Sequence, residues 1–196
     1  GIFNNGGTLD VSNSTVSNNS ATGTLGNGGG IHLNGGSANV MLSTISGNAA
    51  NNHGGGIFNL GSVTVETSTI TDNNASNNGG GFAQDMGTDA ASFSSCIVAG
   101  NSALGMGTDV YSNGTVSSNG YNLVGEDDSN DFPAQPSDQE GTAASPLNAM
   151  LAPLADNGGN TMTHNLMCGS PAIDAGTPGD FTKDQVNQNV FGGQRD

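Results

Sequence analysis

The feature of this sequence that most constrains its fold is a Gly-Gly-Gly-apolar tetrapeptide, which recurs three times within the first 82 residues. The copies are Gly28-Gly29-Gly30-Ile31, Gly54-Gly55-Gly56-Ile57 and Gly79-Gly80-Gly81-Phe82, and Gly1-Ile2 matches the end of a fourth. The four apolar residues are separated by 29, 26 and 25 positions. A self-similarity of this period indicates a repeat protein built from stacked coils.

A recurrent asparagine shows how the coils align. Each repeat ends in one asparagine, with Val or Ile three residues earlier and further apolar or small residues eight and ten residues earlier. Apolar residues two apart are strand periodicity, and no stretch of this region has helical spacing. We therefore expect about three short strands per coil. We also expect a hydrogen-bonded column of stacked asparagines at Asn19, Asn48, Asn73 and Asn101.

Stacking such coils with their strands parallel predicts an all-β fold, the parallel β-helix, in which each coil buries its inner face on its neighbours. Residues 1–125 are expected to form about five coils. All six prolines follow the fifth coil, and the repeat fades there. We expect residues 126–145 to form an exposed acidic loop and residues 146–196 to form an irregular C-terminal cap, because an open last coil would present unpaired backbone groups.

The composition excludes several classes of partner. The chain of 196 residues carries a net charge of −15, and Lys183 and Arg195 are its only strong cations. Nucleic-acid binding and attachment to an anionic membrane both depend on basic residues, so we expect neither a nucleic-acid partner nor direct membrane insertion. The low hydrophobic content, 33%, is compatible with a solenoid because its core is a narrow column.

The C-terminal part carries the motifs of a known family. They are Asn119-Gly120-Tyr121-Asn122-Leu123-Val124-Gly125, Leu151-Ala152-Pro153-Leu154-Ala155-Asp156-Asn157-Gly158-Gly159-Asn160-Thr161-Met162-Thr163-His164 and Gly169-Ser170-Pro171-Ala172-Ile173-Asp174-Ala175-Gly176. This region resembles the choice-of-anchor Q domain of bacterial surface proteins, and the upstream repeats resemble those of polymorphic outer-membrane proteins. The resemblance implies a right-handed, pectate-lyase-like β-helix, export, attachment to the cell surface and no assigned activity.

The repeats offer no evident catalytic machinery, so we expect a protein that is not an enzyme. Polysaccharide lyases on β-helices use an Arg or Lys base, and the repeat region contains neither residue. Hydrolysis needs two carboxylates on one face. Asp10 aligns with Asn39 and Thr64, and no neighbouring coils stack two acids. We therefore assign no catalytic residue and no required cofactor.

The acidic loop is the one candidate metal site. Its spacing has the character of a loose Ca²⁺ loop, although it lacks the glycine and final glutamate of an EF-hand. The candidate ligands are Asp127, Asp128 and Asp131. The alternative is that these carboxylates only keep the protein soluble.

Two outward rows are candidate binding surfaces. The first is a hydroxyl row that could order water at an ice surface or could consist simply of good strand residues, at Thr15, Thr44 and Thr69. The second is an aromatic row that stacks on sugar rings or is covered by residues 146–196, at Phe3, His32 and Phe58.

The two cysteines leave two alternatives open. Cys96 and Cys168 form one disulfide in an exported protein, or they remain two buried thiols, since Cys96 occupies a position where other coils have serine.

These observations lead us to expect a non-catalytic, extracellular or outer-surface β-helix that acts as a structural stalk, an adhesin or a self-assembling fibre subunit. Its partners would be other copies of itself or surface glycans. The alternative is a carbohydrate-binding or polysaccharide-degrading module.

Overall fold

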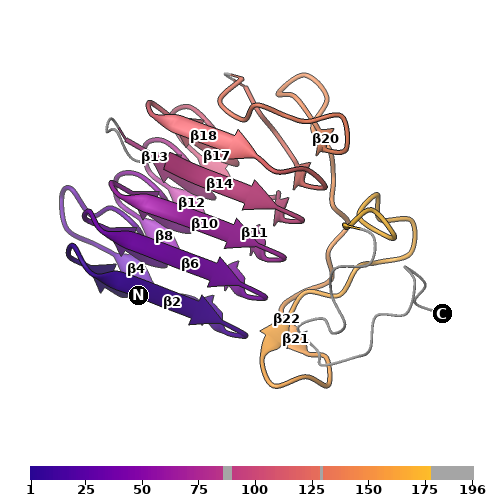
Figure 1. The fold of residues 1–196 in the computed structure, drawn as a ribbon, viewed down its shortest axis with the longest axis horizontal. Helices are drawn as coiled ribbons and strands as arrows, with labels where there is room; N and C mark the ends of the chain where they lie inside the picture. The colour runs from indigo at the N-terminus through magenta and orange to yellow at the C-terminus, as the bar shows by residue number, and fades with distance from the viewer. Residues whose placement is uncertain (86–89, 129, 178–196) are drawn as a thin grey trace.

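The computed structural model describes residues 1–85, 90–128 and 130–177. All regular structure in these residues is β-strand, and the strands stack in parallel along one axis (Figure 1). The parallel β-helix predicted from the repeats is therefore confirmed. Among the described residues, no helix has the length and apolar character needed to cross a membrane.

Four parallel sheets run along the solenoid, and each takes one strand from successive coils. Sheet A contains β1 (Ile2–Asn4), β5 (Ile31–Leu33), β9 (Ile57–Asn59), β13 (Phe82–Gln84) and β17 (Val110–Ser112). Sheet B contains β2 (Thr8–Ser12), β6 (Ser37–Met41), β10 (Ser62–Glu66), β14 (Ala90–Ser94) and β18 (Thr115–Ser118). Sheet C contains β3 (Thr15–Ser17), β7 (Thr44–Ser46), β11 (Thr69–Thr71), β15 (Ile97–Val98), β19 (Leu123–Val124) and β20 (Gln139–Glu140). Sheet D contains β4 (Ser20–Ala21), β8 (Ala49–Ala50), β12 (Asn74–Ala75) and β16 (Ser102–Ala103).

Most coils thus contain four strands rather than the three expected. The additional strand, in sheet D, has only two residues, which is too short to display the alternation that marks a strand in the sequence. The predicted register of the other sheets is present. In sheet C, for example, Val16 pairs with Ile45, Ile45 with Ile70, and Ile70 with Val98. The inward residues form one continuous column of buried aliphatic and aromatic side chains.

The glycine tetrapeptide is explained by contacts between coils. Gly54 has a φ of +67°, a conformation that costs glycine little. A Cβ atom on Gly55 would lie 2.4 Å from the backbone oxygen of Asn74, and one on Gly56 would lie 2.6 Å from that of Gly81. The first glycine therefore turns the chain, while the second and third allow backbones to approach closely.

Residues 126–145, called here the closing segment, are mostly exposed, as expected, but they are more than a loop. They contribute β20, which pairs in parallel with β19 as a sixth strand of sheet C. Phe132 is 1% exposed and lies edge-on to Phe93, with ring centroids 5.8 Å apart. The closing segment therefore covers the end of the core, because an aromatic side chain fills the last level of the column.

Residues 146–177, called here the strap, do not cap the end of the solenoid. They run back along its side toward the first coil and include a short antiparallel pair, β21 (Ala155–Asp156) and β22 (Met162–Thr163) (Figure 1). Leu151 and Ala172 pack with Ile97 and Leu123 of sheet C. The remainder of the expected cap, residues 178–196, lies outside the described residues.

Candidate functional site

The predicted asparagine column is a continuous hydrogen-bonded ladder. Asn19 Nδ2 donates to Asn48 Oδ1 at 3.0 Å, Asn48 Nδ2 to Asn73 Oδ1 at 2.9 Å, and Asn73 Nδ2 to Asn101 Oδ1 at 2.9 Å. Each backbone N–H of the first three also donates to the side-chain oxygen of the next asparagine. The side chains are therefore saturated by one another and serve the scaffold rather than a ligand.

The ladder ends at a carboxylate that the sequence analysis missed. Asp109 Oδ1 accepts from the backbone N–H and from Nδ2 of Asn101, at 2.9 and 2.8 Å. Burial raises the pKa of Asp109 to about 6, although these hydrogen bonds and one from the backbone of Glu126 oppose the rise. The signal was present in the sequence, because Gly107-Thr108-Asp109 replaces the Gly-Gly-Gly of earlier coils.

A second polar column at the corner between sheets B and C was also missed. Backbone N–H groups of Ser14 and Ser43 donate to the serine hydroxyl of the next coil, at 3.1 Å in both cases. Further along, the N–H of Cys96 donates to Asn122 Oδ1 at 2.9 Å, and the N–H of Asn122 donates to Asp138 Oδ1 at 2.7 Å. Both polar columns therefore end at a buried or half-buried carboxylate.

The three candidate calcium ligands do not converge on a common point. Asp127 Oδ1 and Oδ2 accept from the backbone N–H groups of Asp131 and Phe132, at 2.9 and 3.0 Å. Asp131 Oδ2 accepts from the N–H of Ser112 at 3.1 Å, while Asp128 is exposed. The described residues contain no group of three His, Cys, Asp or Glu side chains arranged to hold a metal ion. The acids at 127 and 131 bond to backbone amides at the end of the solenoid.

Two glutamates of the closing segment, Glu126 and Glu140, have raised pKa values. Desolvation, a side-chain hydrogen bond to Asp127 and the negative charges of Asp127 and Asp138 raise the pKa of Glu140 to about 7. Desolvation, followed by repulsion from Asp128, also raises the pKa of Glu126. This end of the solenoid is therefore less charged near neutral pH than its formal composition indicates.

The aromatic row is neither free nor covered by the strap. Phe3 contacts His32 edge-on, and His32 contacts Phe58 edge-on, with centroids 5.0 and 5.1 Å apart. His53, from the preceding turn, stacks on both Phe58 and Tyr111 at 6.1 and 6.2 Å and so extends the row. Phe3 is 62% exposed, His32 is partly exposed and Phe58 is 2% exposed, so the row is most open to solvent at its first ring.

The hydroxyl row lies under the strap and is not an open surface. Thr15 Oγ1 donates to the backbone oxygen of Met162 at 2.7 Å, and Thr44 is buried. Beside this row, Ser46 Oγ lies 2.8 Å from His164 Nε2, and His164 Nδ1 lies 2.7 Å from the carbonyl oxygen of Ala152. Because a carbonyl only accepts, Nδ1 carries a proton and donates it to the carbonyl of Ala152. His164 thus fixes the strap to sheet C.

The cysteines are not bonded to each other. Cys96 is buried at the serine position of its coil, while Cys168 is exposed on the strap, and both are free thiols. The Cys96 thiol donates to backbone oxygens of Val65 and Ser94, as the serines of other coils do to theirs. Burial raises the pKa of Cys96 to about 12, so this thiol is unreactive in the folded protein.

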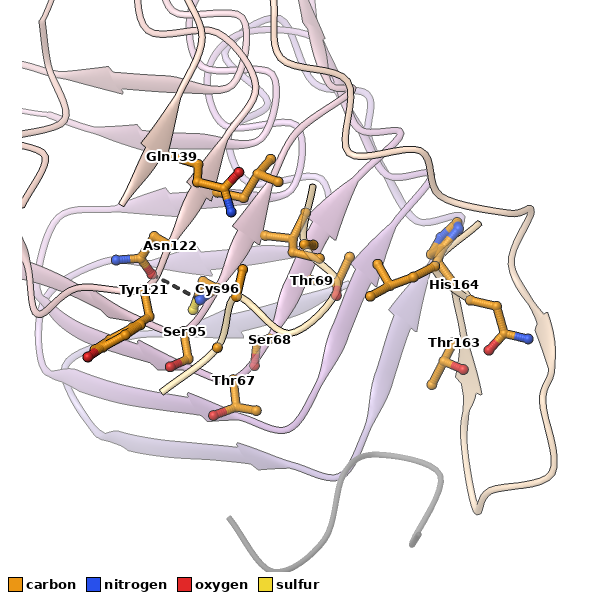
Figure 2. A pocket seen from close by; sticks show the side chains of 17 residues that line it. Thr67, Ser68, Thr69, Ser95, Cys96, Tyr121, Asn122, Gln139, Thr163 and His164 are labelled. Atoms are coloured by element: carbon orange, nitrogen blue, oxygen red, sulfur yellow. Dashed lines mark hydrogen bonds between the residues drawn. The ribbon is translucent and has the colours of Figure 1, made fainter. Parts of the chain in front are cut away.

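The remaining candidate site is a groove of about 260 Å³ between sheet C and the strap (Figure 2). Thr67, Ser95 and Tyr121 form one wall, and Thr163 and His164 lie on the other side (Figure 2). Thr67, Ser95 and Tyr121 occupy equivalent corner positions in successive coils, with φ values of +45°, +52° and +61°. A second cavity, lined by Asp109 and Glu126 among others, lies beside the end of the asparagine ladder.

Comparisons with known protein families, with curated proteins and with solved structures found no match to this chain.

Proposed function

We propose that this chain is a non-catalytic, extracellular module of a bacterial surface protein, where it serves as a stiff structural stalk with an adhesive surface. The observation that carries the proposal is that polar side chains of successive coils hydrogen-bond to one another. The asparagine ladder and the corner column bond coil to coil along the axis, and both end at carboxylates of the same chain. Buried and mutually saturated polar networks make a solenoid rigid.

The outward acids also favour a role without catalysis. Asp10 accepts a hydrogen bond from Asn39 Nδ2 at 2.8 Å, so its carboxylate pairs with an amide rather than with a second acid. Asp127 and Glu140 line neither of the two cavities described. The carboxylates of Asp109 and Glu126 do line the second cavity, but they accept hydrogen bonds from Asn101 and Thr108 of the scaffold. General acid–base chemistry needs a carboxylate that is free to exchange a proton with a substrate. We therefore propose no catalytic residue and no cofactor.

Self-assembly remains part of the proposal in a narrower form. The end of the solenoid beyond β18 is covered by the closing segment and Phe132. We propose that copies associate side by side, since head-to-tail stacking would require the closing segment to move.

The surface role is tested with the native bacterium and the isolated chain. Brief protease treatment of intact cells should release peptides of this chain, and the purified chain should release no reducing ends from any polysaccharide in a panel. Peptides obtained only after cell lysis would refute the location. Release of reducing ends would refute the non-catalytic assignment in favour of a polysaccharide-degrading module.

A further inference from the structure

Seven dipeptides of the sequence place glycine directly after asparagine. They begin at Asn5, Asn27, Asn34, Asn78, Asn113, Asn119 and Asn157. In such a dipeptide the glycine backbone nitrogen can attack the side-chain carbonyl carbon of the asparagine, because glycine has no Cβ to hinder the approach. The reaction needs a nitrogen that can lose its proton and a side chain that can rotate toward it. The structure of each corner therefore decides which of the seven can react.

The glycine N–H is hydrogen-bonded in five of the seven dipeptides. Those of Gly28 and Gly79 donate to backbone oxygens of the next coil, at 2.9 and 3.0 Å. Those of Gly114, Gly120 and Gly158 donate to a side-chain oxygen two residues earlier in the chain, at 3.1, 3.0 and 3.0 Å. A bonded amide keeps its proton and its position until the bond opens, as in hydrogen exchange. Reaction at these five dipeptides is therefore slow.

The corner at Asn34 and Gly35, between β5 and β6, is open. The Gly35 N–H donates no hydrogen bond within the described structure. A Cβ atom placed on Gly35 would find no heavy atom beyond its chain neighbours within 4 Å, and Asn34 is exposed. The Asn34 side chain donates from Nδ2 to Asn5 Oδ1 at 2.9 Å, but this bond is exposed and water can replace it. Both reacting groups are therefore free to approach each other.

Asn5 and Gly6 occupy the same corner one coil earlier. The Gly6 N–H likewise donates no hydrogen bond to any described residue, and a Cβ on Gly6 would also find open space. Asn34 is the more decisive position because coils pack on both sides of it, with β5 between β1 and β9. Its exposure therefore does not depend on an end of the solenoid.

We propose that Asn34 is a site of spontaneous deamidation through a succinimide. Hydroxide removes the Gly35 amide proton, the nitrogen forms a bond to Asn34 Cγ, and the Cγ–Nδ2 bond breaks. Ammonia leaves with a proton taken from water, which regenerates the hydroxide. Water then opens the ring at either carbonyl and gives aspartate or isoaspartate. The reaction requires no oxidant, reductant or enzyme, and it is independent of the function proposed above.

Either product changes the contact between the first two coils. A carboxylate at position 34 adds one negative charge and cannot donate to Asn5 Oδ1. Isoaspartate also lengthens the backbone by one methylene group between β5 and β6. There the N–H groups of Asn34 and Ser37 donate to the backbone oxygens of Asn4 and Gly7, at 2.8 and 3.0 Å. The pairing of the two coils should therefore loosen at this corner.

Timed peptide mapping of the whole folded chain tests the proposal. The chain is incubated at neutral and at mildly alkaline pH, then digested with pepsin in acid, which slows further reaction, and conversion at each asparagine is measured by mass spectrometry. We expect Asn34 to convert about 5-fold faster or more than Asn113 and Asn119, which are also exposed but precede a bonded glycine. Conversion of Asn34 should accelerate with pH, because hydroxide generates the nucleophile.

The same chain in denaturant is the matched reference, because every glycine N–H is then open. There the rates at Asn34, Asn113 and Asn119 should converge. Asn34→Gln keeps the amide but would have to form a larger ring, so conversion at this position should be lost. Asn113→Gln is the control variant and should leave the conversion of Asn34 unchanged, with folding of both variants verified by circular dichroism.

The proposal is overturned if Asn34 of the folded chain converts no faster than Asn113 and Asn119, since the open corner would then not promote the reaction. It is equally overturned if the difference persists in denaturant, because the neighbouring sequence rather than the fold would then set the rate.

Discussion

Replacing Asn73 by alanine tests how far the buried ladder stabilises the solenoid. Asn73 is 1% exposed. Its Oδ1 accepts from the backbone N–H of Asn48 at 3.0 Å and from Asn48 Nδ2 at 2.9 Å. Its Nδ2 donates to Asn101 Oδ1 and to the carbonyls of Ile45 and Thr71, each at 2.9 Å. The substitution removes all five bonds and leaves the surrounding coils in place.

The expected cost follows from the groups that lose their partner. Two buried donors of Asn48, the backbone N–H and one Nδ2 hydrogen, would have no acceptor. A buried donor without a partner costs about 1–3 kcal/mol, so the free energy of unfolding should fall by about 2–6 kcal/mol. Domains of this size are stable by only about 5–15 kcal/mol, so a large part of the stability would be lost.

Asn19 provides the matched control because it has the same residue type in the same motif at the half-exposed first coil. Water can replace the bonds that Asn19 makes to Asn48 and Ser17, so Asn19→Ala should cost about 1 kcal/mol or less. The measurement is guanidinium unfolding at pH 7, followed by far-ultraviolet circular dichroism, with midpoints and slopes for both variants. Equal costs for Asn73→Ala and Asn19→Ala would refute the reasoning, since burial would then not matter.

Three further predictions follow from burial elsewhere. Because the pKa of Asp109 is raised from 3.8 to about 6, the folded state binds this proton more tightly than the unfolded state does. The resulting stabilisation is full below pH 3.8 and is lost as the pH rises through 6. Asp109→Asn should remove that part of the pH dependence of the thermal midpoint, and an unchanged profile would contradict the assignment. Gly55→Ala should prevent folding because its Cβ would lie 2.4 Å from a backbone oxygen, whereas Gly176→Ala, with open space around it, should melt like the wild type. In a thiol titration Cys168 should react in the native protein and Cys96 only after unfolding, and simultaneous reaction of both would show that Cys96 is not buried.

The periodic part of the chain could be predicted because successive coils carry similar residues at corresponding positions. Val16, Ile45, Ile70 and Val98 occupy one phase of the repeat, and they pair in that register. The same phase placed the asparagines in one column. Only the two-residue strands of sheet D were missed, since two residues carry no alternation.

The candidate sites could be predicted only in part. Thr15, Thr44 and Thr69 were correctly placed on one outward row, but an outward position is not an exposed one, and the strap covers the row. Asp127 and Asp131 were recognised as a concentration of acid, but their partners are backbone N–H groups, which every sequence contains and no spacing reveals.

The sequence by itself determined the solenoid, because a repeat with a fixed inward residue and glycines at its corners leaves one way to stack the coils. Tertiary structure alone decided the course of residues 126–177, which follow no period and so carry no register. Phe132 closes the core and His164 ties the strap to Ser46 through contacts between residues distant in the chain. The groove exists only because the strap lies beside Thr67 and Tyr121, so it could not be recognised from either segment alone.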